Sequence, residues 1–208
     1  MKRHRPPHLY LDDTFYAITG SILYSHALLR PNWAKDLLLQ KMKELIPEYD
    51  FHCYAWVILD DHYHILIKTR IGQDVAKLMQ RLHSITSLHM NRREGCPGRQ
   101  VWYSYWDTCM RNERDIWTHF NYLHNNPVKH GYVLHWADWP YSSYRHYLEH
   151  KGEEWLMDVW ERYPVIDYLE GDDFLPGPLE CRREPAGADL RPHSSLLIDS
   201  DWDTSFLG

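Results

Sequence analysis

Two segments rich in β-branched and aromatic residues, 51–59 and 62–68, are separated only by Asp60 and Asp61. Segments of this composition are typical of β-strands, and a two-residue connection joins neighbouring antiparallel strands in a hairpin. The sequence therefore predicts an antiparallel sheet that contains this hairpin. Because residues two apart on a strand share a face, His62 and His64 are expected on one face of the sheet and Tyr63 on the other.

The flanking segments predict further strands and helices in alternation. Composition and hydrophobic periodicity indicate strands at 14–24 and 101–110 and helices at 33–46, 73–91, 112–125, within 136–148 and at 153–162. Asn112 is the expected N-cap of the third helix and Pro127 its expected end. The order β-α-β-β-α-β-α predicts an α+β fold, a ferredoxin-like antiparallel sheet with helices packed on one face and a C-terminal helical extension.

The charge of the chain is unevenly distributed around a net value of −6. Residues 1–150 contain 18 Lys and Arg against 15 Asp and Glu, a net charge of +3, whereas residues 151–208 contain 5 against 14, a net charge of −9. A mildly basic body is compatible with a polyanionic ligand without requiring one. From about residue 171 the Pro, Gly, Asp and Ser content predicts a poorly ordered acidic tail.

Several classes of protein are disfavoured by what the sequence lacks. No uncharged apolar run is long enough to span a bilayer, and the first residues lack the apolar stretch of a signal peptide. No two of the four cysteines have the C-x-x-C spacing of a zinc knuckle. These features predict a cytoplasmic protein without a membrane partner.

His62 and His64 form the most specific local pattern, because two imidazoles on one strand face can bind the same cation. The chain has 15 histidines, however, so pairs at this spacing also arise by chance. From spacing alone, a polar sheet face is the more frequent explanation. Asp60 and Asp61 are candidates for supporting groups around such a site, although a role in the turn is the simpler expectation for both.

Tyr122 lies in the predicted third helix, four residues before Asn126, so the two side chains share a helix face. Taken alone, Tyr122 is one of 15 tyrosines and is equally well explained as a partly buried aromatic.

Four motifs that follow one another along the chain give these residues a more specific meaning. They are VILDDHYHILIK, GRQVWYSYWDTCMRNERD, NYLHNNPVKHGYV and ADWPYSSYRHYL. In this order they resemble the REP-associated tyrosine transposases, which belong to the single-tyrosine HUH transposases of the insertion-sequence type. The resemblance covers about residues 5–155, which we take as the transposase domain. Residues 156–208 then form an acidic C-terminal extension.

The resemblance implies a role for each matching residue. His62 and His64 would bind a divalent metal, Tyr122 would be the nucleophile, and Asn126 would be a third metal ligand. Two positions depart from the family pattern: Tyr63 replaces the usual aliphatic residue between the histidines, and Leu59-Asp60 replaces the usual Met-Pro. Imidazole and amide ligands suit Mn²⁺ or Mg²⁺, although imidazole also accepts Zn²⁺ or Ni²⁺.

The implied activity is metal-dependent cleavage and strand transfer of single-stranded DNA through a 5′-phosphotyrosine, at repeats that form hairpins. A DNA transposase of this type acts on single-stranded or hairpin DNA, and the REP-associated type implies a monomer. Two alternatives remain open at this point. One is an HUH nickase with a host role, and the other is a non-catalytic module that binds single-stranded nucleic acid through aromatic side chains.

Basic and aromatic side chains outside the motif core are candidates for DNA contacts. Phosphates would be neutralised by Arg92, Arg93, Arg99, Arg111, Arg114 and Lys129, and bases would stack on Tyr103 and Tyr105. Trp102 and Trp106 lie on the same predicted strand, and because alternate residues of a strand cannot all be exposed, at least half of the four aromatics are expected in the core. Lys2, Arg3 and Arg5 are a candidate DNA-contacting arm.

Overall fold

The computed structural model describes residues 10–165. The basic arm at Lys2, Arg3 and Arg5 and the predicted disorder from about residue 171 lie outside the described residues, and the domain boundary at residue 155 stays a prediction. Within the described part of the chain, no helix is both long enough and apolar enough to cross a membrane.

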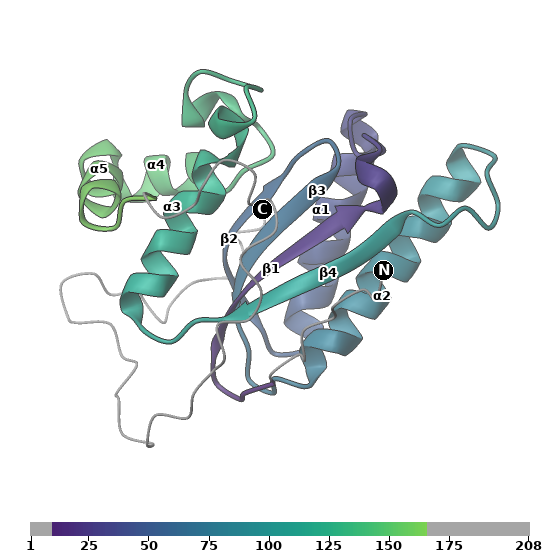
Figure 1. Ribbon diagram of the computed structural model, residues 1–208, viewed down its shortest axis with the longest axis horizontal. Coiled ribbons are helices and arrows are strands. Elements are labelled where there is room, and N and C mark those ends of the chain that lie inside the picture. Colours follow the sequence, from purple (N-terminus) through teal and green to yellow (C-terminus); the bar gives the residue numbers. More distant parts are fainter. Residues whose placement is uncertain (1–9, 166–208) are drawn as a thin grey trace, which may run out of the picture.

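A four-stranded antiparallel sheet forms the centre of the molecule (Figure 1). Its strands are β1 (Phe15–Ile22), β2 (His52–Ile58), β3 (His62–Lys68) and β4 (Trp102–Cys109), and their order in the sheet is β2-β3-β1-β4. Each neighbouring pair is antiparallel. With α1 (Asn32–Glu48) between β1 and β2 and α2 (Asp74–Arg93) between β3 and β4, this is the predicted ferredoxin-like arrangement.

The predicted hairpin is present, with Leu59 N–H donating to the carbonyl of His62 at 2.8 Å across the Asp60-Asp61 turn. The remaining elements are a 3₁₀ turn at Leu23–Ser25, α3 (Glu113–Lys129), a 3₁₀ turn at Trp136–Asp138, α4 (Tyr144–Lys151) and α5 (Glu153–Arg162).

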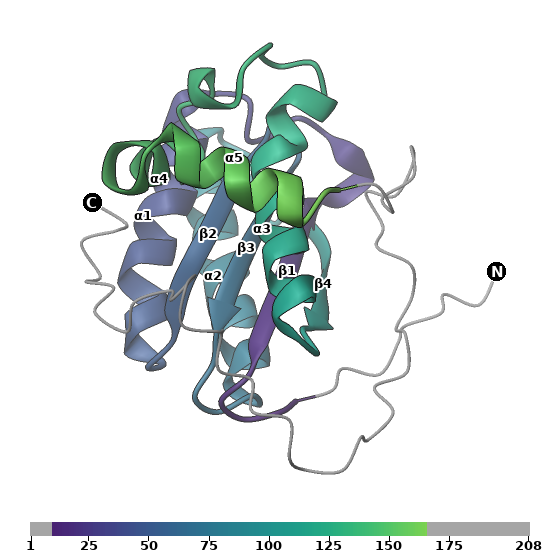
Figure 2. The ribbon, with the colours of Figure 1, turned by 90° about the vertical axis from the view of Figure 1, so that its left-hand side faces the viewer.

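The helices cover both faces of the sheet, so the prediction of helices on one face only is wrong. Helices α1 and α2 pack on one face, whereas α3 crosses the opposite face over β2 and β3 (Figure 2). The reason lies in β3, where all residues from His62 to Ile67 are buried. A strand that is buried on both sides needs a packing layer on both sides, and α3 supplies the second layer over the face that carries His62 and His64.

On the α2 face of β3, Tyr63 is a core residue. Its hydroxyl pairs with His83 Nε2 at 2.8 Å, and its ring lies against Gly20, where an added Cβ would collide with the ring. Tyr63 therefore points away from His62 and His64, as the alternation of the strand predicts.

Helix α3 begins as predicted and ends later than predicted. Asn112 is its N-cap, with Oδ1 accepting a hydrogen bond from the backbone N–H of Asp115 at 2.9 Å. Pro127 does not end the helix, which continues to Lys129, and the N–H of His130 still bonds to the carbonyl of Asn126 at 2.9 Å. Proline removes one hydrogen bond, and the burial of this part of α3 outweighs that local cost.

Two histidines, the buried His124 and the half-buried His83, make the stability of the fold sensitive to acid. Burial lowers the pKa of His83 and of His124 to about 3, from about 6.5 in an unfolded chain. Because the unfolded chain binds these protons first, the stabilisation present above pH 6.5 is lost as the pH falls toward 3. As the pH falls from 7 to 5, each histidine is expected to lower the free energy of unfolding by about 2 kcal/mol, because only the unfolded chain binds its proton.

Urea unfolding at the two pH values measures this loss. The variant His124→Gln should show a smaller loss than the wild type between pH 7 and pH 5. An equal loss in wild type and variant would show that His124 is not the group that titrates.

Candidate active site

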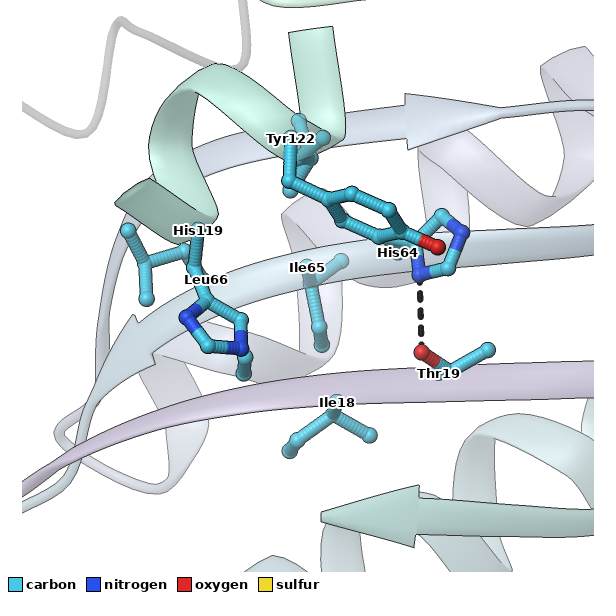
Figure 3. Close-up of a pocket in the computed structure, with 9 residues that line it drawn as sticks. Ile18, Thr19, His64, Ile65, Leu66, His119 and Tyr122 are labelled. Atoms are coloured by element: carbon cyan, nitrogen blue, oxygen red, sulfur yellow. Dashed lines mark hydrogen bonds between the residues drawn. The ribbon is translucent and has the colours of Figure 1, made fainter. Parts of the chain in front are cut away.

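His62 and His64 lie side by side on the face of β3 that α3 covers. Their ring centroids are 5.0 Å apart and both side chains are buried. His64 Nδ1 shares a hydrogen bond of 2.7 Å with Thr19 Oγ1 on β1, as the dashed line in Figure 3 shows. His62 Nδ1 lies 2.7 Å from Asp61 Oδ1. Each ring is thus held at Nδ1 by a neighbouring side chain, the arrangement that orients a histidine for metal binding.

The partner of His62 fixes which of its nitrogens carries the proton. A carboxylate only accepts hydrogen bonds, so in the neutral ring Nδ1–H of His62 donates to Asp61 and Nε2 carries the lone pair. That Nε2 is buried and has no hydrogen-bond partner among the described residues. A buried lone pair without a donor is costly, and a cation at this position would remove that cost.

Tyr122 packs against His64 from α3, and Asn126 lies one helical turn further along the same helix. The ring centroid of Tyr122 is 5.6 Å from that of His64, and Figure 3 shows the phenolic oxygen directed toward the imidazole. Asn126 is completely buried, and its Nδ2 donates to the carbonyl of Tyr122 at 2.9 Å. This bond identifies the other amide atom as Oδ1, which is buried and has no partner among the described residues.

The side chains at this position are chemically suited to a divalent cation. Within residues 10–165, no three His, Cys, Asp or Glu side chains form a group that could hold a metal. The family resemblance gives the amide oxygen of Asn126 as the candidate third protein ligand beside His62 and His64. The two unpaired atoms, His62 Nε2 and Asn126 Oδ1, are a nitrogen and an oxygen lone pair, which borderline and hard divalent cations accept.

Other groups at this site were not singled out by the sequence. His130, the C-cap residue of α3, lies four residues after Asn126, and its ring centroid is 5.2 Å from that of His62. Helical spacing from Tyr122 through Asn126 would have indicated it. His119 lines the small pocket beside Tyr122, and burial lowers its pKa (Figure 3). Thr19 was not predictable, because its contact with His64 depends on strand register.

The basic residues proposed for DNA contact do not form a single surface. Arg92, Arg93 and Arg99 lie near the end of α2, whereas Arg111 and Arg114 lie at the start of α3, beyond the other end of β4 (Figure 1). Eight residues of β4 separate the two groups by about 25 Å.

Arg93, Arg99 and Lys129 differ in the side chains that they contact. Arg99 pairs with Glu94 at 2.6 Å, and the Arg93 guanidinium lies 4.5 Å from the ring centroid of Trp33. Lys129 lies beside the candidate nucleophile, with Nζ 5.4 Å from the ring centroid of Tyr122.

The aromatic residues of β4 divide between the two faces of the sheet. Trp102 is buried and stacked on His83, and Tyr105 has its hydroxyl 3.5 Å from that of Tyr10. Tyr103 is 37% exposed and has its ring centroid 5.9 Å from that of Trp106. Trp106 is the cross-strand neighbour of Thr19, so it lies on the histidine face of the sheet.

Known proteins are similar to this chain in sequence, and a solved structure is similar to it in fold. A REP-associated tyrosine transposase of Haemophilus influenzae is 29% identical over 140 residues, covering 62% of this chain and 77% of that protein. The REP-associated tyrosine transposase of Escherichia coli is 30% identical over 95 residues, covering 45% of this chain, and the match spans only about half, 54%, of its own length.

A solved structure described as a REP-associated tyrosine transposase bound to a REP hairpin has the same fold. Its TM-score is 0.60 at 22% sequence identity, with coverage of 74% of this chain and 88% of that one. The family described as "Transposase IS200 like" matches residues 14–126, which include both histidines, Tyr122 and Asn126. Because this segment is more than half of the 208 residues, the chain belongs to the IS200-like transposase family.

Proposed function

We propose that this protein cleaves single-stranded DNA and transfers the cut strand through a covalent bond to Tyr122. The observation that carries the proposal is the position of the Tyr122 ring against His64, beside two buried lone pairs that no described donor satisfies. A nucleophile next to a cation site is the arrangement that phosphodiester cleavage requires, because the phosphate oxygens repel an attacking oxygen.

The proposed reaction exchanges one phosphoester for another. The phenolic oxygen of Tyr122 forms a bond to phosphorus, and the bond between phosphorus and the 3′-oxygen breaks. The phenol loses its proton, the departing oxygen gains one as a 3′-hydroxyl, and the 5′-phosphate remains on the tyrosine. Since no water is consumed, a second 3′-hydroxyl can reverse the exchange and complete strand transfer.

In this proposal His62, His64 and Asn126 hold a divalent metal, Mg²⁺ or Mn²⁺. A bound divalent cation supplies charge neutralisation at the phosphate and promotes ionisation of the attacking group. Asp61 and Thr19 hold the two imidazoles through Nδ1, so that Nε2 is the nitrogen available as ligand. The uncharged amide of Asn126 adds an oxygen donor without adding negative charge beside the phosphate.

The proposed substrate is single-stranded DNA next to a hairpin. The relative whose structure is described as bound to a REP hairpin supports this choice. Lys129 is the candidate for a phosphate next to the site, because its ammonium group lies over the Tyr122 ring. For the arginines near the two ends of β4 and for Tyr103, contact with more distant parts of the substrate remains a proposal, as do a monomeric state and a cytoplasmic location.

A covalent-adduct assay tests this function. We expect the protein, incubated with Mn²⁺ and a labelled oligonucleotide carrying a hairpin and a single-stranded flank, to form a protein–DNA species that survives denaturant. Addition of a second strand with a free 3′-hydroxyl should convert the adduct into a joined product. Adduct without joining would favour the nickase alternative, and binding without any adduct would favour the non-catalytic module.

A further inference from the structure

Lys35 is a buried charged side chain for which the proposed chemistry has no use. It has a relative exposure of 2% and lies on α1, the helix that packs on the sheet face opposite α3 (Figure 2). Its Nζ is 2.7 Å from Asp60 Oδ1 and donates to the carbonyl of Arg30 at 3.0 Å. The ammonium also lies 5.5 Å from the ring centroid of Trp139 and 5.4 Å from that of Tyr141.

Asp60 is the first residue of the turn that connects β2 to the histidine strand. Its second carboxylate oxygen accepts from Arg30 Nε at 3.1 Å, and its carbonyl accepts from Leu29 N–H at 2.9 Å. In the same turn, the carbonyl of Asp61 accepts from Ile22 N–H at 2.8 Å. The turn is thus held by the end of β1 and by the segment that joins β1 to α1, with Lys35 as its buried ionic contact.

The same turn also carries the side chain that orients His62. Asp61 Oδ1 holds Nδ1 of His62 at 2.7 Å, which leaves Nε2 as the lone pair directed into the site. A displacement of the Asp60-Asp61 backbone would move this carboxylate relative to the imidazole. Groups that orient a ligand in this way commonly contribute about 10- to 100-fold to metal affinity.

We infer that Lys35 is a positioning residue for His62, acting through its ion pair with Asp60 to hold the turn that places Asp61 against the imidazole. This inference rests on the proposed function, because it gives His62 the role of metal ligand. An ion pair with one fully buried partner is a poor means of gaining stability alone, since burying the charges is costly. Holding the Asp60-Asp61 turn in one geometry is a role that accounts for this costly burial.

The test measures Mn²⁺ affinity from the electron paramagnetic resonance signal of the free ion. Lys35→Met should weaken Mn²⁺ binding about tenfold. Lys41→Met is the matched control on α1, because Lys41 pairs with Glu44 and does not contact the turn, and it should bind Mn²⁺ as the wild type does. In ¹⁵N spectra of the histidine side chains, Lys35→Met should also reduce the population of the His62 tautomer protonated at Nδ1.

A double variant separates positioning from general stability. Lys35→Met with Asp60→Leu removes both charges, so it should recover thermal stability relative to Lys35→Met alone, while Mn²⁺ affinity stays about tenfold weak. Recovery of wild-type affinity in the double variant would overturn the inference. So would wild-type affinity of Lys35→Met in an experiment where His62→Ala loses binding. If His62→Ala itself keeps wild-type affinity, the proposed metal role of His62 fails and the inference fails with it.

Discussion

Tyr122→Phe is expected to abolish covalent DNA adduct formation while leaving the fold and the metal site in place. The substitution removes only the phenolic oxygen, which is the atom proposed to bond to phosphorus. The ring, which packs against His64, is kept. Removal of a nucleophile leaves no alternative route to the covalent intermediate, so we expect cleavage to fall at least about a thousandfold, or about 4 kcal/mol in the activation barrier.

The control for this prediction is an exposed tyrosine that the proposed chemistry does not use. Tyr24 is 77% exposed, and Tyr24→Phe should cleave DNA at the wild-type rate. Affinity for a hairpin oligonucleotide and for Mn²⁺, each measured with Tyr122→Phe, should remain within about twofold of wild type, because phenylalanine keeps the contacts of the ring. An adduct of undiminished yield with Tyr122→Phe would show that another residue is the nucleophile.

The family resemblance singled out the residues of the candidate site, and local rules account for where each lies on its own strand or helix. The hairpin turn fixes where β3 begins, and the alternation along β3 then places His62 and His64 on one face. Helical spacing places Asn126 one turn from Tyr122, and the N-cap Asn112 marks where that helix starts. Local rules do not bring β3 and α3 together, and for that the family resemblance was needed.

The side of the sheet on which each helix packs could not be read from the same rules. The consecutive apolar residues Ile65, Leu66 and Ile67 did carry the relevant signal, because a strand buried on both faces has no polar alternation. The expected alternation of polar and apolar faces concealed it, since His62 and His64 made one face look polar. Those two polar side chains are buried because α3 covers them.

The supporting contacts around the histidines show a further limit of sequence reasoning. Asp61 was expected to serve the turn, and in the structure it serves the turn through its backbone and His62 through its carboxylate. The link between Lys35 and Asp60 spans 25 residues and depends on how α1 packs beside the hairpin. Such contacts follow from tertiary packing and have no periodic signature in the chain.

The largest expected effect on metal binding comes from the histidine pair itself. His64→Ala removes one of three proposed protein ligands from a buried position, and the remaining His62 and Asn126 cannot replace it. We expect Mn²⁺ affinity to fall at least about a hundredfold, and DNA cleavage at a fixed metal concentration about a thousandfold. Isothermal titration calorimetry measures the Mn²⁺ affinity. The yield of covalent protein–DNA adduct measures the reaction.

Two further variants test whether the loss of Mn²⁺ affinity is specific to His64 and its supporting contact. His52 is an exposed histidine on the neighbouring strand β2, so His52→Ala should leave Mn²⁺ affinity unchanged. Thr19→Val keeps the shape of the side chain but removes the hydroxyl that bonds His64 Nδ1, and a loss of about tenfold is expected. The loss of Mn²⁺ affinity should therefore be largest for His64→Ala, smaller for Thr19→Val and absent for His52→Ala. If His52→Ala weakened binding as strongly as His64→Ala, the metal would bind elsewhere, and Tyr122 would lose the neighbouring charge on which its proposed chemistry depends.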